Sequence, residues 1–113
     1  MKVLIIDDSR AIRMLIKRTI RLAGFKKATV EEASNGSEGL RLIEASPPDL
    51  ILCDLNMPEM SGLELLQTIK DRGLSVKMGI VTSDRSQSTR SQAMDGGALF
   101  VITKPFGPEH FKQ

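Results

Sequence analysis

Four short apolar segments and one weaker segment at residues 29–33 recur along the chain, each followed by a polar or amphipathic stretch. Residues 3–6 and 50–53 are continuous apolar runs that end abruptly at aspartates, Asp7–Asp8 and Asp54. Runs this short and this continuous are typical of strands buried on both faces. Three further segments complete the set of expected strands: residues 29–33, 76–81 and 99–102.

Between these segments the apolar residues change to helical spacing. After Ser9, a residue favoured at helix N-caps, Ile12, Ile16 and Ile20 recur every fourth position until Gly24 supplies a stop. We expect further helices over residues 37–45, 62–72 and 86–94. Their strict alternation with strands predicts an α/β fold, a doubly wound five-stranded parallel sheet with helices on both faces.

The end of the chain leaves one element incomplete. Pro108 is well placed in the first turn of a fifth helix, yet about one and a half turns at 3.6 residues each would reach Gln113. Such a short or truncated helix would leave one face of the sheet partly uncovered. A segment missing from this chain, or a partner, would then cover the gap, and the sequence does not choose between them.

Composition narrows the class of protein. The 113 residues are 41% hydrophobic and 27% charged, which predicts one soluble globular domain over residues 1–113. A net charge of +2 is too weak to indicate direct nucleic-acid binding. No apolar stretch approaches the roughly 18 residues of a membrane span, and no signal-peptide pattern opens the chain. The single Cys53 fits a reducing compartment, so we expect a cytoplasmic protein without membrane contact.

Polar residues follow four of the expected strands, where ligands bind in open parallel sheets. They are Asp7–Asp8, Asp54, Thr82 and Lys104. Three carboxylates at one sheet edge repel one another unless they are protonated or neutralised by a cation. A hard divalent ion with oxygen ligands resolves this, and no His or Cys cluster suggests zinc or copper. We therefore predict Mg²⁺ as the cofactor, with one carboxylate able to act as a nucleophile toward phosphorus.

The whole set resembles the receiver domains of bacterial two-component response regulators. The resemblance covers essentially the whole chain except the end of the fifth helix. It rests on the following residues, in this order: Asp7–Asp8, Asp54, Asn56–Met57–Pro58, Gly62, Thr82 and Lys104–Pro105–Phe106. It implies a flavodoxin-like sheet with strand order 2-1-3-4-5 and a cis bond between Lys104 and Pro105.

The resemblance also implies a role for each residue of the site. Asp54 would accept the phosphoryl group and, with Asp8, bind the metal directly. Asp7 would bind the metal through water, and Asn56 through its backbone carbonyl. The two remaining residues, Thr82 and Lys104, would contact the phosphoryl oxygens.

A function in signal transduction follows from this resemblance. A histidine kinase or phosphotransfer protein would donate the phosphoryl group, and the chain would switch its affinity for an output partner or effector domain that the sequence does not identify. The chain would thus be a signalling receiver and not an enzyme acting on separate substrates, although it would catalyse its own phosphorylation and dephosphorylation. Both a stand-alone chemotaxis-type regulator and the receiver of a longer protein, monomeric or dimeric, fit the sequence.

One departure from the family favours an alternative. Many receivers carry Tyr or Phe on the fifth strand three residues before the lysine, and here that position is Val101. Phe100 cannot simply replace it, because adjacent strand residues point to opposite faces. The alternative is a pseudo-receiver that binds or dimerises without phosphorylation. A phosphatase with an aspartate nucleophile is disfavoured by Asn56, and a flavodoxin by the lack of a phosphate-binding loop after the first strand.

Three other features receive simpler interpretations. Cys53 is interpreted as a small buried hydrophobe, and His110 is assigned no role. The first helix is strongly basic, which favours a solvated face and leaves docking of an acidic partner as the alternative. Its basic residues are Arg10, Arg13, Lys17, Arg18 and Arg21.

Overall fold

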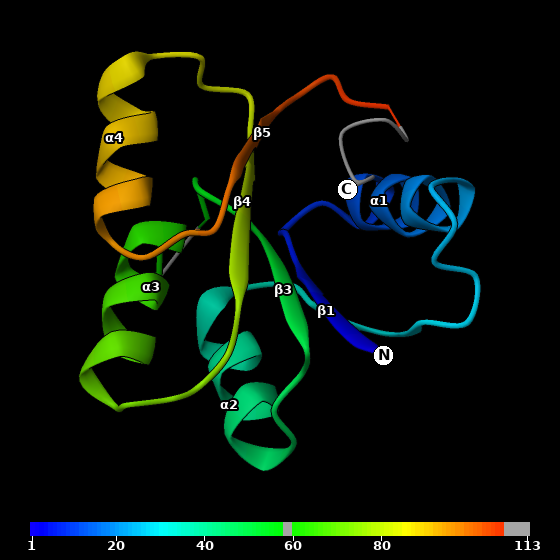
Figure 1. Ribbon diagram of the computed structural model, residues 1–113, viewed down its shortest axis with the longest axis horizontal. Helices are drawn as coiled ribbons and strands as arrows, with labels where there is room; N and C mark the ends of the chain where they lie inside the picture. The colour runs from blue at the N-terminus through cyan, green and yellow to red at the C-terminus, as the bar shows by residue number, and fades with distance from the viewer. Residues whose placement is uncertain (58–59, 108–113) are drawn as a thin grey trace.

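The computed structural model describes residues 1–57 and 60–107, in which strands and helices alternate (Figure 1). The strands are β1 (Lys2–Ile6), β2 (Thr29–Ala33), β3 (Leu50–Asp54), β4 (Met78–Thr82) and β5 (Val101–Thr103). The helices are α1 (Arg10–Leu22), α2 (Gly36–Ala45), α3 (Gly62–Asp71) and α4 (Gln87–Asp95). The predicted fifth helix falls outside the described residues.

The strands form one parallel sheet in the order β2-β1-β3-β4-β5, which confirms the expected order. The register aligns the carboxyl ends of the central strands. Ile6 pairs with Cys53, and Asp54 pairs with Val81, so β1, β3 and β4 end at nearly the same level. The side chains that follow these strands therefore meet at one edge of the sheet.

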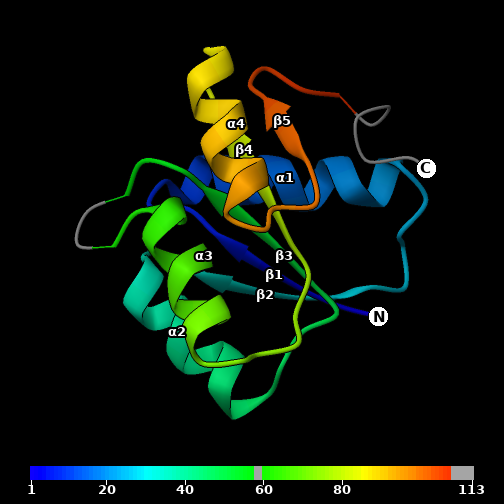
Figure 2. The ribbon, with the colours of Figure 1, turned by 60° about the vertical axis from the view of Figure 1, so that its left-hand side comes forward.

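Helices cover both faces of the sheet. α1 lies on one face, and α2, α3 and α4 lie on the other (Figures 1 and 2). Alternate residues of the strands supply two separate apolar cores, as expected where every strand residue points to one face or the other. The core under α1 contains Val3, Ile5, Ile16, Ile20, Leu52, Val81 and Ile102. The opposite core includes Leu4, Ile6, Ile43, Ile51, Leu65, Ile80 and Ala93.

The predicted helix starts and stops are confirmed at α1. The Ser9 side chain accepts a hydrogen bond from the N–H of Ile12, and Gly24 adopts a φ of 109° just past the last turn. A positive φ is costly for residues with a Cβ, which explains the glycine at this position. Among the described residues, none of the helices has the length and apolar character that crossing a membrane requires.

The predicted strand bounds were wrong by one residue at one end of β1 and of β3, and they were wrong at both ends of β4 and β5. β4 begins at Met78 and runs through Thr82, although residues 76–81 were expected. β5 occupies Val101–Thr103 and not residues 99–102. Both strands extend past their apolar runs because the N–H of Lys104 donates to the carbonyl of Thr82 at 2.7 Å. Hydrogen bonding between the strands, and not side-chain polarity, sets where they end.

Candidate metal and phosphoryl site

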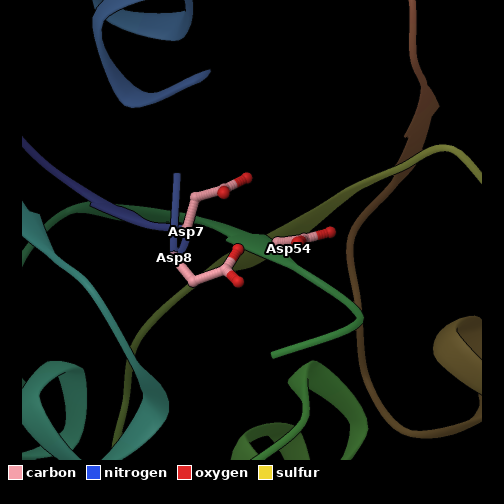
Figure 3. A group of neighbouring side chains, drawn as sticks. All are labelled: Asp7, Asp8 and Asp54. Carbon is pink, nitrogen blue, oxygen red and sulfur yellow. The ribbon is translucent and has the colours of Figure 1, made fainter. Parts of the chain in front are cut away.

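Three carboxylates converge beyond the ends of β1 and β3. Ligand oxygens of Asp7, Asp8 and Asp54 all lie within 4.8 Å of one another (Figure 3). Asp7 and Asp54 are buried, at 1% and 8% exposure, whereas Asp8 is exposed. The cluster therefore has two buried members and one that faces solvent, which leaves an approach from solvent open.

Lys104 supplies the positive charge within this cluster. Its Nζ lies 3.3 Å from Oδ2 of Asp7 and 3.6 Å from Oδ1 of Asp54. The side chain of Lys104 is 20% exposed, so the ammonium group is partly withdrawn from water. The bond between Lys104 and Pro105 is cis, as the resemblance implied. One ammonium group cannot neutralise three carboxylates, and the cluster retains an excess of negative charge.

The environment of Asp54 raises the pKa of its carboxyl group. Burial is the largest cause, because removal from water penalises the charged form. The nearby Lys104 lowers this pKa, and the negative charge of Asp7 raises it again. Hydrogen bonds from the backbone N–H groups of Leu55 and Asn56 also lower it. The net effect is a carboxylate whose ionised form is less stable than in water.

Thr82 ends the strand next to Asp54. It is fully buried, and its Oγ1 accepts a hydrogen bond of 3.1 Å from the N–H of Asp84. Asp84 in turn accepts hydrogen bonds from the N–H of Ser86, the N-cap of α4, at 2.8 Å and from Oγ1 of Thr89 at 2.6 Å. The Thr82 hydroxyl is thus linked by hydrogen bonds to the first turn of α4.

The loop that follows Asp54 depends on a glycine. The N–H of Gly62 donates to the carbonyl of Leu55 at 2.9 Å. A Cβ at Gly62 would lie 2.7 Å from the carbonyl oxygen of Asp54, closer than real Cβ atoms approach. Asn56 lies in this loop, exposed to solvent, and Pro58 falls outside the described residues. The close approach explains the glycine that the sequence places at the start of α3.

The donor set fits a hard divalent cation. Three carboxylates in contact range, one of them open to solvent, match the oxygen ligands and retained waters that Mg²⁺ prefers. Cys53 is excluded as a ligand, because it is fully buried and its pKa is raised well above the usual value, by burial first and then by Asp54 and Asp7. The simple interpretation of Cys53 as a buried hydrophobe agrees with this environment.

Phe100, which precedes β5, and Val101, its first residue, point to opposite faces of the sheet, as expected. Val101 belongs to the core with Ile80 and Ala93, on the α4 side of the sheet. Phe100 packs against the core under α1, where its ring occupies the space that a Cβ at Gly79 would need. Phe100 therefore does not replace the aromatic residue that many receivers carry at position 101.

Two members of the basic helix, Arg13 and Lys17, are partly buried and do not match the predicted solvated face. The side chain of Arg13 is 14% exposed and is paired with Glu32, whereas Arg10, Arg18 and Arg21 are exposed. Nη1 of Arg13 also donates to the backbone carbonyl of Asp7 at 2.6 Å. The contact was not predicted, because the composition of the helix does not distinguish Arg13 from its other basic residues. The signal in the sequence is the position of Arg13 one turn after the Ser9 cap, which places it near the strand ends.

Comparison with known proteins identifies relatives of the whole chain. The model of the family "Response regulator receiver domain" matches residues 3–113. A protein-glutamate methylesterase/protein-glutamine glutaminase of Hahella chejuensis is 40% identical over 97% of this chain and 32% of its own length. The nitrate/nitrite response regulator NarL of Escherichia coli is 37% identical over 95% of this chain and 49% of its own. The chain thus spans about a third of the length of the first of these curated relatives and about half of the second.

Solved structures agree with these sequence relatives. The chemotaxis protein CheY4 of Vibrio cholerae superimposes with a TM-score of 0.84 at 31% identity. The superposition covers 97% of this chain and 91% of that one. The likeness extends over the sheet and all the described helices.

Proposed function

The chain belongs to the response regulator receiver domain family, and on that premise we propose that it takes a phosphoryl group from a histidine kinase or phosphotransfer protein onto Asp54. Receiver domains are signalling modules, and this one would change its affinity for an output partner on phosphorylation. We further propose that residues 1–113 act as one receiver unit in the cytoplasm, where Cys53 stays reduced. The observation that carries the proposal is the convergence of Asp7, Asp8 and Asp54 beside Lys104.

The residues divide the chemistry between binding and reaction. Asp8 and Asp54 would hold Mg²⁺ directly, Asp7 would hold it through water, and Asn56 would offer its backbone carbonyl. The bound ion supplies positive charge that stabilises the oxygens of the transferring phosphoryl group. The positive charge of the ion would offset the excess of negative charge that Lys104 leaves in the cluster.

Asp54 is the nucleophile in this proposal. One of its carboxylate oxygens forms a bond to phosphorus while the bond from phosphorus to the donor breaks, and the electron pair of that bond leaves with the donor. A histidine donor then takes up a proton and returns to neutral imidazole. Lys104 already lies 3.6 Å from Asp54 and would pair with a phosphoryl oxygen. Thr82 would donate its hydroxyl proton to another, giving up its present position beside Asp84.

A small phosphoryl donor tests the proposal without a kinase. Wild-type protein incubated with acetyl phosphate and Mg²⁺ should gain the mass of one phosphoryl group, measured on the intact protein. Asp54→Asn should gain none, and wild type with excess chelator should gain far less. Ser83→Ala, which alters a neighbouring hydroxyl outside the proposed set, serves as the matched control and should be modified like wild type.

Two results would contradict the proposal. An unmodified wild type would favour the pseudo-receiver alternative that Val101 motivates. Equal modification of wild type and Asp54→Asn would show that another residue accepts the group.

A further inference from the structure

Arg13 is one of two partly buried basic residues on α1, the other being Lys17. Its side chain is 14% exposed, whereas Arg10 and Arg18 on the same helix are exposed. A guanidinium group withdrawn from water needs hydrogen-bond acceptors to offset its lost hydration. Its acceptors are the side chain of Glu32 on β2 and the backbone carbonyl of Asp7, in the turn that carries Asp7 and Asp8.

Two hydrogen bonds hold the guanidinium group between β1 and β2. Nε donates to Oε1 of Glu32 at 3.0 Å, and Nη1 donates to the backbone carbonyl of Asp7 at 2.6 Å. Glu32 is fixed in the sheet, where it pairs with Ile5 of β1. Arg13 therefore connects α1, the end of β1 and the neighbouring strand.

The carbonyl that Arg13 contacts belongs to the peptide group joining Asp7 to Asp8. Because a peptide group is planar, holding its oxygen fixes the plane that both Cα atoms share. The directions in which the two carboxylates leave the backbone depend on this plane. Arg13 thus contacts the one backbone oxygen through which both acidic side chains can be oriented together.

The same turn is held from its other side. The N–H of Ser9 donates to Oδ1 of Asp7 at 2.9 Å, and the N–H of Arg13 donates to the carbonyl of Ser9 at 3.0 Å. The side chain of Ser9 caps α1 through the N–H of Ile12. With Ser9 bound to the carboxylate and Arg13 bound to the carbonyl, the turn has little freedom left.

Geometry outweighs charge in this contact. Arg13 is paired with Glu32 at 3.0 Å, so the pair is close to neutral and its field at the acidic cluster is small. An unpaired charge would act on the acidic cluster through its electric field. Arg13 instead acts through the direction of its hydrogen-bond donors. Arginine suits the task because its planar group presents several donors in a fixed arrangement, which lysine lacks.

We propose that Arg13, anchored by Glu32, is a positioning residue that orients the Asp7–Asp8 turn for cation binding. The inference rests on the proposed function, since it assigns Arg13 to the same Mg²⁺ site. Loss of residues that orient metal ligands typically weakens metal affinity by about 10- to 100-fold. The turn of this protein should behave in the same way.

Titration of Mg²⁺ followed by ¹⁵N NMR of the backbone amides measures the effect. Arg13→Met should bind Mg²⁺ about tenfold more weakly than wild type. Arg13→Lys should recover part of the loss, because an ammonium group can reach one acceptor but not both in a fixed geometry. Arg18→Met, which removes the same charge from an exposed position of α1, should bind like wild type.

The outcomes separate this inference from the proposed function. If wild type shows no Mg²⁺ binding, the proposed function fails. If wild type binds and Arg13→Met binds equally well, or if Arg18→Met loses as much affinity, the positioning role of Arg13 is overturned alone. Should Arg13→Met lose its dispersed amide spectrum, Glu32→Gln decides: weaker Mg²⁺ binding in a folded protein supports the role, and unchanged binding overturns it.

Discussion

Opposing influences act on the carboxyl group of Asp54. Burial raises its pKa, Lys104 and the loop N–H groups lower it, and the net shift is upward. A group whose pKa is raised on folding contributes stability that is fully present below its unfolded pKa and is lost as pH rises through the folded value. At neutral pH, ionised Asp54 therefore destabilises the metal-free protein.

Replacement of Asp54 by Asn should relieve this destabilisation. We expect Asp54→Asn to raise the free energy of unfolding of metal-free protein at pH 7 by about 1 kcal/mol, a size typical of substitutions that remove functional strain. The gain should shrink as pH falls through the folded pKa of Asp54, where the wild-type carboxyl is protonated. Urea unfolding at a series of pH values measures both effects.

A matched substitution controls for the effect on stability of removing any one negative charge. Asp71→Asn changes an exposed carboxylate at the end of α3 and should alter stability by less than about 0.5 kcal/mol. Lower stability of Asp54→Asn at pH 7 would show that burial and Asp7 do not outweigh Lys104 in the metal-free site.

The acidic residues were predictable from sequence, and the contact of Arg13 was not. Aspartates that follow apolar runs fall at strand ends whatever the details of packing, so Asp7, Asp8 and Asp54 could be placed together. Arg13 was assigned to a solvated face because five basic residues share one helix. Which of them turns toward the sheet depends on the angle at which α1 crosses it, and composition does not encode that angle.

At the scale of elements, the start of α3 packs closely against the end of β3. The site of Gly62 has no room for a side chain, since a Cβ there would lie 2.7 Å from the carbonyl oxygen of Asp54 and 3.0 Å from Cα of Leu55. The neighbouring Ser61 forms a capping box with Glu64, with hydrogen bonds of 3.2 and 3.3 Å. The capping box stabilises the start of α3, whereas Gly62 approaches the backbone of Asp54.

Substitutions at these two neighbours should therefore separate stability from cation binding. Gly62→Ala should cost about 1–3 kcal/mol of unfolding free energy, as overpacking does, and weaken Mg²⁺ binding by moving Asp54. Ser61→Ala should cost about 1 kcal/mol through the lost cap and leave Mg²⁺ affinity unchanged. Chemical unfolding and calorimetric titration measure the two quantities. Unchanged Mg²⁺ affinity in Gly62→Ala would show that the close approach does not position Asp54.

Most elements were predictable, and the errors fall at their ends. Apolar runs located β1, β3, β4 and β5, because a strand buried on both faces has to be apolar throughout. The weaker pattern of β2 fits its position at the edge of the sheet, where its residues are mostly not buried. The ends of β4 and β5 were misplaced because Thr82 and Thr103 are polar yet pair across the sheet. Hydrogen bonding between strands depends on the partner strand, which lies far away in sequence.

Across the whole molecule, the strand order places the three carboxylates and Lys104 at one edge of the sheet, apart from position 101. The register brings β1, β3 and β4 to the same level, and β5 adds Lys104 beside them. Val101 and Phe100 lie in opposite cores, so the chemical site is separable from the aromatic part of the usual switch. The site should bind its cation whether or not the aromatic residue is present.

Thermal unfolding in the presence of Mg²⁺ tests most directly whether folding builds one cation site from the Asp7–Asp8 pair and the distant Asp54. Wild type should be stabilised progressively, by about 2.7 kcal/mol at 100 times the dissociation constant, because a ligand that binds only the folded state stabilises it by mass action. Asp8→Asn and Asp54→Asn should lose most of this response, and Asp71→Asn should keep it, all at constant ionic strength. A wild type that gains nothing from Mg²⁺, or variants of Asp8 and Asp54 that gain as much as wild type, would contradict the account.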